Sequence, residues 1–199
     1  MRELLVATKN QGKLREIREL LSDLDLKVTS LADYNNCPEV VEDGKTFRQN
    51  AVKKALVIGR HLGKLTLGED SGLEVKALGN KPGIYSARFS GPAATDKKNN
   101  SKLLRLLKGV KPLKRQARYR CLAALVDNEQ LVGVVEGNCT GRIAEKRKGQ
   151  NGFGYDPLFL IPRYSKTFGE LDPGIKARIS HRARALKKLK ILLAKYFSK

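Results

Sequence analysis

Histidine, aromatic residues and acidic residues are all scarce in this chain. Its 199 residues include two histidines, no tryptophan and only 6% aromatic residues, and 20 Asp and Glu stand against 40 Lys and Arg. Neither histidine lies in an HExxH or comparable ligand spacing, so the sequence does not support zinc-dependent hydrolysis. The net charge of +20 favours a polyanionic partner. The low aromatic content and the lack of a known RNA-binding signature weigh against specific nucleic-acid binding.

Cysteine pairs and long apolar runs are missing as well. The three cysteines, Cys37, Cys121 and Cys139, are odd in number and have no CxxC spacing. We therefore expect free thiols in a reducing cytoplasm. No apolar run approaches the roughly 20 residues that span a bilayer. The first residues turn polar too soon to predict a signal peptide, so we expect no membrane partner.

The hydrophobic pattern predicts one α/β domain over residues 1–199. Hydrophobic residues make up 41% of the chain, which is enough for a core. Strands and helices alternate early and strands cluster later, which favours a mixed sheet. Residues 65–67 and 73–75 are predicted as two strands flanking an acidic turn. The other predicted elements are strands at 3–8, 27–31 and 158–161, a hairpin of 118–127 and 130–137, and helices at 12–21, 46–61, 96–108 and after Ser180.

A polar loop, Thr8-Lys9-Asn10-Gln11-Gly12-Lys13, connects the first predicted strand to the first helix. The start of a helix presents free amides and the positive end of its dipole, which suits phosphate. Lys13 would add a full charge in the first turn. The loop is not a Walker A motif, because it lacks the spaced glycines and the final Lys-Ser/Thr. The alternative is an ordinary turn with a solvated lysine.

Two adjacent carboxylates occur in Glu69-Asp70-Ser71-Gly72, after an apolar segment. Magnesium prefers hard oxygen ligands and is usually held by one or two carboxylates with water and substrate phosphate. This pair therefore predicts a magnesium site, to which Glu42 could add a carboxylate. The alternative is a polar turn whose acids cap backbone amides.

A glycine-rich aromatic segment, Gly152-Phe153-Gly154-Tyr155-Asp156-Pro157, precedes the last predicted strand. Glycines let a backbone approach a ligand closely, and a ring can stack on a base. Asp156 could accept hydrogen bonds from a base edge. Lys176 and Ser180-His181-Arg182 could add donors at the start of the last helix. A structural turn with a core Phe, and a structural histidine, are the alternatives.

Taken together, these segments resemble the inosine/xanthosine triphosphate pyrophosphatase family. The resemblance covers nearly the whole chain in order, and six motifs carry it. They are 7–13 (ATKNQGK), 42–47 (EDGKTF) with Asn50-Ala51 and Lys53, 69–73 (EDSGL), 82–88 (PGIYSAR), 152–157 (GFGYDP) and 180–182 (SHR).

The resemblance implies an elongated α/β fold with a central mixed sheet, flanking helices and two lobes around a nucleotide-binding cleft. It also implies a homodimer. Asp70 would be the catalytic base, and Glu42 and Asp70 would hold Mg²⁺. Glu39 or Glu69 could replace Glu42 as the second ligand. The residues implied to hold the triphosphate are Thr8, Asn10, Lys13, Lys53 and Lys176. Those implied to face the purine are Phe153, Asp156, His181 and Arg182. The resemblance also implies substrate contacts for Lys9, Gln11, Gly12, Ser71, Gly154 and Tyr155.

The implied reaction cleaves inosine and xanthosine triphosphates, ribose or deoxyribose, to the monophosphate and pyrophosphate. Such an enzyme cleanses the nucleotide pool. Two alternatives stay open at this point. The +20 charge favours a basic nucleic-acid-binding protein. A pyrophosphatase for modified pyrimidines or methylated bases would share the fold but lack the SHR and FGYD combination.

Overall fold

The computed structural model describes residues 2–198. One mixed sheet runs in the order β2-β1-β3-β5-β6-β7-β8, with β4 paired to β3. β1 is parallel to β2 and β3, whereas β3–β4, β6–β7 and β7–β8 are antiparallel. The predicted mixed sheet with flanking helices is confirmed. The strands are β1 (Arg2–Val6), β2 (Leu26–Ser30), β3 (Leu65–Val75), β4 (Lys81–Pro82), β5 (Gln116–Asp127), β6 (Gln130–Ile143), β7 (Phe159–Ile161) and β8 (Lys166–Thr167).

Contacts divide the chain into two compact units. The first unit comprises residues 1–70, 121–137 and 182–199, and the second comprises 71–120 and 138–181. Strands β3, β5 and β6 each contribute residues to both. The single domain expected over residues 1–199 stays a prediction. The helices are α1 (Gln11–Leu20), α2 (Phe47–Leu62), α3 (Asp96–Leu106), α4 (Pro173–Ile179) and α5 (His181–Phe197).

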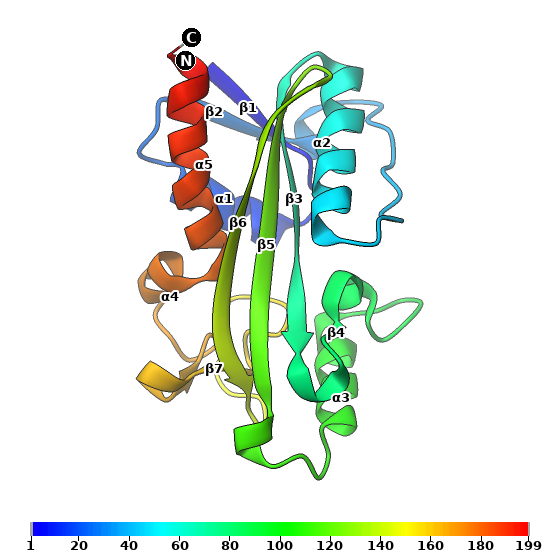
Figure 1. Ribbon diagram of the computed structural model, residues 1–199, viewed down its shortest axis with the longest axis vertical. Helices are drawn as coiled ribbons and strands as arrows, with labels where there is room; N and C mark the ends of the chain where they lie inside the picture. Colours follow the sequence, from blue (N-terminus) through cyan, green and yellow to red (C-terminus); the bar gives the residue numbers. More distant parts are fainter. Residues whose placement is uncertain (1, 199) are drawn as a thin grey trace. The chain divides into compact units, whose positions relative to one another are not determined.

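The core of the first unit follows from the two-residue period of its strands. Leu4 and Val6 of β1 join a cluster with the apolar faces of α1 and α5. Leu5 and Ala7, one residue out of phase, contact Ile58 of α2 instead. Successive strand side chains point to opposite faces, so α2 covers one face and α1 and α5 the other (Figure 1).

The second unit has its own core, in which aromatic rings dominate. Tyr119 of β5 lies with its ring centroid 4.6 Å from that of Phe159 and 6.3 Å from that of Phe168. Leu103 of α3 and Leu107, which directly follows that helix, belong to the same cluster. This core supports the segment that carries Phe153.

The predicted helix boundaries are largely confirmed, and a side-chain cap marks the start of α1, α2, α3 and α4. The side chain of Thr46 accepts a hydrogen bond from Gln49 N at 3.1 Å at the start of α2. Gly63 ends that helix at φ 61°, a left-handed conformation that glycine adopts at little cost. The predicted hairpin turns at Asn128-Glu129, and both of its strands are longer than predicted.

One sequence prediction was wrong, and one helix was missed. The acidic turn expected between residues 67 and 73 does not exist, because Glu69, Asp70 and Ser71 lie inside the continuous strand β3. Helix α4 was not predicted, although Asp172 accepts a hydrogen bond from Gly174 N and Pro173 occupies the first helical position, a typical helix start.

Among residues 2–198, no helix is both long enough and apolar enough to cross a membrane.

Candidate active site

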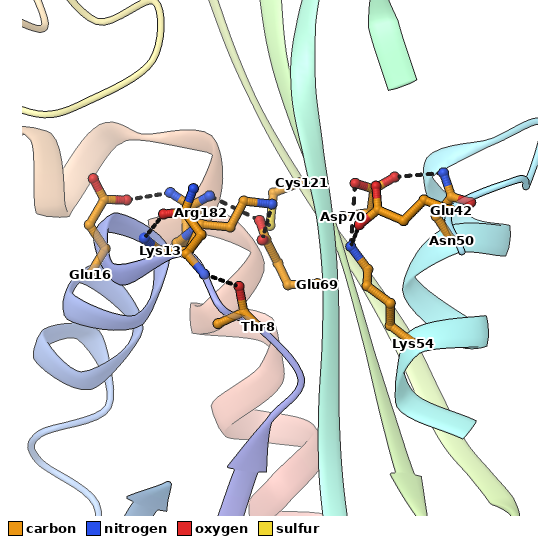
Figure 2. Close-up of polar contacts among 11 residues, drawn as sticks. Thr8, Lys13, Glu16, Glu42, Asn50, Lys54, Glu69, Asp70, Cys121 and Arg182 are labelled. Atoms are coloured by element: carbon orange, nitrogen blue, oxygen red, sulfur yellow. Dashed lines mark hydrogen bonds and ion pairs between the residues drawn. The ribbon is translucent and has the colours of Figure 1, made fainter. Parts of the chain in front are cut away.

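The two adjacent carboxylates of β3 serve different faces of the strand. Glu69 points toward α1 and Arg182, whereas Asp70 points toward α2 (Figure 2). This follows from strand geometry, since neighbouring side chains alternate. Both residues are buried, with 2% and 4% of their surface exposed. The polar residues are compatible with an interior strand because each carboxylate has buried partners on its own face.

The Asp70 cluster consists of Asp70, Asn50, Lys54 and Glu42. Asn50 Nδ2 donates to Asp70 Oδ2 at 3.1 Å, and Lys54 Nζ lies 3.6 Å from Asp70 Oδ1. Lys54 Nζ also lies 2.7 Å from Glu42 Oε1, so one ammonium group joins the two carboxylates. Burial raises the pKa of Asp70 above its usual value, although Lys54 acts in the opposite direction. Glu42 and Asp70 are the pair that could hold a divalent cation.

The Glu69 cluster consists of Glu69, Lys13, Arg182, Glu16 and Cys121. Lys13 Nζ lies 2.9 Å from Glu69 Oε2, and Arg182 Nη2 lies 3.0 Å from Glu69 Oε1. Arg182 also pairs with Glu16 of α1. Burial disfavours the ionised carboxylate, but the cations of Arg182 and Lys13 hold the pKa of Glu69 well below its usual value. Burial, and then Glu69, raise the pKa of the Cys121 thiol, so this residue is not an activated nucleophile.

The predicted phosphate loop has a fixed shape at the start of α1. Asn10 Oδ1 accepts from Lys13 N at 2.9 Å, and Asn10 N donates to Thr8 Oγ1 at 3.1 Å. Lys9 is exposed in the loop, and Gln11 and Gly12 are the first two residues of the helix. The loop therefore places Lys13 beside Glu69, while the first residue of the helix lies at the surface.

In the second unit, Asp156 organises the segment around Phe153. Asp156 Oδ2 accepts from Phe153 N at 2.9 Å and pairs with Lys176 Nζ. Lys176 Nζ also lies 5.1 Å from the centroid of the Phe153 ring. Gly152 has φ 76°, and a Cβ there would lie 2.0 Å from Asp156 Oδ2. Only glycine at this position allows that close approach of the carboxylate.

Three further predicted residues, His181, Tyr155 and Ser71, also belong to the second unit. His181 stacks on Tyr119, with ring centroids 4.5 Å apart and an interplanar angle of 7°. Tyr119 OH lies 3.4 Å from Asp156 Oδ1. Tyr155 is buried, and its hydroxyl donates to Ser86 O at 2.8 Å. Ser71 is half-buried in β3.

The structure places three predicted residues differently from expectation. Lys53 lies in an exposed ion pair with Asp43 at 2.7 Å. Lys176, expected on the triphosphate, pairs with Asp156. Arg182, expected to face the purine, engages Glu69 and Glu16. Glu39 is exposed. The ligand-binding roles of these residues stay predictions.

Lys54 is the main site residue that sequence reasoning missed. The buried face of α2 includes Phe47, Asn50, Ala51, Ala55 and Ile58. That helical period contains position 54 and leaves position 53 on the outer side. The signal was therefore present in the sequence. Glu16 and Tyr119, which hold Arg182 and His181, had no comparable signal.

Comparisons with known proteins identify the family. The model of the Ham1 family matches residues 4–192. The chain belongs to the Ham1 family. The dITP/XTP pyrophosphatase of Shouchella clausii (strain KSM-K16) is 50% identical to this Ham1-family chain over 190 residues, covering 96% of each protein. The dITP/XTP pyrophosphatase of Desulforamulus reducens is 47% identical, covering 98% of this chain and 97% of that protein.

A solved structure agrees with this assignment. The HAM1 protein from Coxiella burnetii superposes on this Ham1-family chain with a TM-score of 0.88 at 38% identity. The match covers 98% of this chain and all of that one. The resemblance stated from the sequence motifs is therefore confirmed, and the fold is that of Ham1 proteins.

Proposed function

We propose that the chain hydrolyses non-canonical purine nucleoside triphosphates, dITP and XTP above all, to the monophosphate and pyrophosphate. The observation that carries the proposal is the Asp70 cluster, a buried carboxylate held between a lysine and an amide. The relatives named dITP/XTP pyrophosphatase, which match nearly the whole chain, support the same substrates here. The reaction breaks the α–β phosphoanhydride bond.

Magnesium is the proposed cofactor, with Asp70 and Glu42 as its ligands. The donor chemistry fits, because both are hard oxygen ligands and their carboxylates already share one cation, Lys54 Nζ. No group of three His, Cys, Asp or Glu that could hold a metal occurs among residues 2–198, so water and substrate phosphate would complete the coordination. When bound, the metal supplies charge neutralisation on the phosphates and on the departing pyrophosphate.

Asp70 is the proposed general base for the attacking water. Its buried carboxylate, held by Asn50 and Lys54, would take the proton from a water positioned on the same face of β3. The amide of Asn50 fixes one carboxylate oxygen on the face of β3 that points toward α2. Lys54 offsets negative charge on the phosphates. Positioning and electrostatics thus supply most of the catalysis.

Lys13 and the amides at the start of α1 are the proposed triphosphate-binding groups. The side chain of Lys13 is 17% exposed, and Glu69 fixes its direction. Glu69 keeps its negative charge because Arg182 and Lys13 surround it. It therefore acts as a holder of cations, and its position on the opposite face of β3 from Asp70 argues against its being the second metal ligand.

The second unit is proposed to bind the base. Phe153 can stack on any purine, which supplies affinity without selectivity. His181, fixed by Tyr119, is the proposed donor to the 6-oxo group of hypoxanthine and xanthine. Adenine carries an amino donor at that position, which would leave the protein donor unpaired.

The cysteines and an exposed tyrosine bear on the cellular setting and on the oligomeric state. The three free thiols suit a reducing cytoplasm. We propose a homodimer, supported by the family resemblance and by Tyr85, which is 56% exposed within the 82–88 motif. Light scattering of the wild type and of a Tyr85→Arg variant tests this, with a dimer expected to weaken on substitution. A wild-type monomer at micromolar concentration would contradict it.

Pyrophosphate release from ITP, dITP, XTP, GTP and ATP, with and without EDTA, tests the proposed reaction. We expect hydrolysis of the first three, roughly 10⁴-fold weaker use of ATP, and complete inhibition by EDTA that added Mg²⁺ reverses. Release of orthophosphate in place of pyrophosphate would contradict the bond assignment. Equal use of ATP and ITP would contradict base recognition.

A further inference from the structure

Two residues of α3, Asp96 and Asn100, hold both backbone polar groups of Gly154. Asp96 Oδ2 accepts from Gly154 N at 2.7 Å. Asn100 Nδ2 donates to Gly154 O at 2.7 Å and to Asp96 O at the same distance. Asn100 is buried, with 3% of its surface exposed. A helix more than fifty residues earlier in the chain therefore fixes one residue of the aromatic segment.

These contacts fix the backbone on both sides of Phe153. Its N–H donates to Asp156 Oδ2, and its carbonyl accepts from Asp156 N at 3.2 Å. The next N–H, that of Gly154, donates to Asp96. Gly152 and Gly154 both have positive φ, at 76° and 63°, a backbone conformation that glycine adopts at little cost. The hydrogen bonds therefore hold the backbone from which the Phe153 ring projects.

Capping of α3 does not explain Asp96. Thr95 is the N-cap of that helix, and its side chain accepts from Lys98 N at 3.2 Å. An aspartate in the first turn adds a favourable interaction with the helix dipole. Its carboxylate is nevertheless directed to Gly154, where a charged acceptor makes a stronger hydrogen bond than a neutral one.

We propose that Asp96 is a positioning residue for base recognition, which acts through the Gly154 amide to fix the Phe153 ring. Asn100 supports it from the carbonyl side. The inference rests on the proposed function, because it takes Phe153 as the ring that stacks on the purine. Asp96 itself contacts neither base nor phosphate in this role.

Three variants test the proposal: Asp96→Ala, Asp96→Asn and Thr95→Ala. Asp96→Ala should raise KM for ITP about tenfold while changing kcat less, because the ring loses its fixed direction. Asp96→Asn retains an acceptor oxygen and should restore KM to within about threefold of wild type. Thr95→Ala removes the cap of the same helix and should lower Tm without raising KM.

Amide hydrogen exchange at Gly154 and the NMR shifts of the Phe153 ring provide readouts that do not depend on turnover. Faster Gly154 exchange and shifted ring resonances in Asp96→Ala, but not in Thr95→Ala, are expected. Unchanged exchange and KM in Asp96→Ala would overturn the proposal, as would an equal rise of KM in Thr95→Ala. An inactive wild type would contradict the proposed function, and the two NMR readouts would still decide whether Asp96 positions the ring.

Discussion

The two units differ in how they use charge. The first unit carries 19 Lys and Arg against 14 Asp and Glu, and the second carries 21 against 6. In the first unit, the two acidic residues Glu69 and Asp70 are buried, and each contacts a lysine. In the second unit, exposed cations such as Lys111 and Lys114 have no carboxylate partner among residues 2–198.

This difference assigns the net charge of +20 a limited role. A nearly balanced first unit holds its cations in fixed directions, which suits contacts to particular phosphate groups. The surplus of the second unit acts at longer range and is screened beyond about 8 Å at physiological ionic strength. The basic composition that favours nucleic acid therefore arises mainly outside the Asp70 and Glu69 clusters.

The neighbouring lysines of α2 provide the largest contrast. Lys54→Ala should lower kcat/KM for dITP on the order of 10²–10³-fold, because it removes a buried cation from the phosphate site. Lys53→Ala, which breaks an exposed pair with Asp43, should change it less than about threefold. Steady-state kinetics of the two variants provide the measurement. A larger loss of kcat/KM for Lys53→Ala than for Lys54→Ala would support Lys53, the residue predicted from the sequence, as the phosphate-binding lysine.

Breaking the Glu69 cluster should cost stability that an exposed pair does not. Arg182→Ala leaves buried Glu69 with one of its two cationic partners, and we expect about 3–5 kcal/mol of the free energy of unfolding to be lost. Arg60→Ala removes an exposed pair with Glu129 and should cost about 1 kcal/mol or less. Urea denaturation compares the two. Equal losses would mean that burial of the Glu69 cluster has no energetic weight.

Nonspecific binding of RNA should depend on the second unit. Replacing Lys111 and Lys114 by Gln should weaken binding of a single-stranded RNA at low salt by about three- to tenfold and flatten its salt dependence. The same change at Lys187 and Lys195, exposed in α5 of the first unit, should have a smaller effect. Fluorescence anisotropy across a salt series measures both. Tight, sequence-dependent binding at physiological salt would instead revive the nucleic-acid-binding alternative.

The smallest effect concerns acid stability of the first unit. Hydrogen bonds from Lys64 and Tyr34 lower the pKa of Glu3 from 4.5 to about 2. A depressed carboxyl pKa contributes stability that is fully present above the unfolded value and is lost as pH falls through the folded value. The stability difference between wild type and Glu3→Gln should therefore be constant above about pH 5 and shrink toward pH 2. A pH-independent difference in denaturation experiments would contradict this.

Local patterns predicted the elements well, because most of them are coded by local residues. Thr46 and Gly63 mark the ends of α2, and the hairpin turns where the sequence places Asn128-Glu129. The break expected in β3 was wrong, because the compensation of Glu69 and Asp70 comes from Lys13, Lys54 and Arg182, which are distant in sequence. Propensity alone contains no information about such partners.

The site was predictable to the level of motifs and not to that of partners. The motif positions led to Asp70, Lys13 and Phe153, whereas the choice between Lys53 and Lys54 required the buried face of α2. The contacts of Asp96 with Gly154 depend on tertiary structure and leave no local signal.

Asp70, buried beside Lys54 and Asn50, is the residue on which the proposed pyrophosphate release depends most. Its most direct test is the turnover of dITP by folded Asp70→Asn protein, measured beside Asp25→Asn, the same change at an exposed position. We expect Asp70→Asn to lower kcat on the order of 10²–10⁴-fold or more, and Asp25→Asn to match wild type. Turnover by Asp70→Asn within a few-fold of wild type would mean that Asp70 is neither the base nor an essential metal ligand.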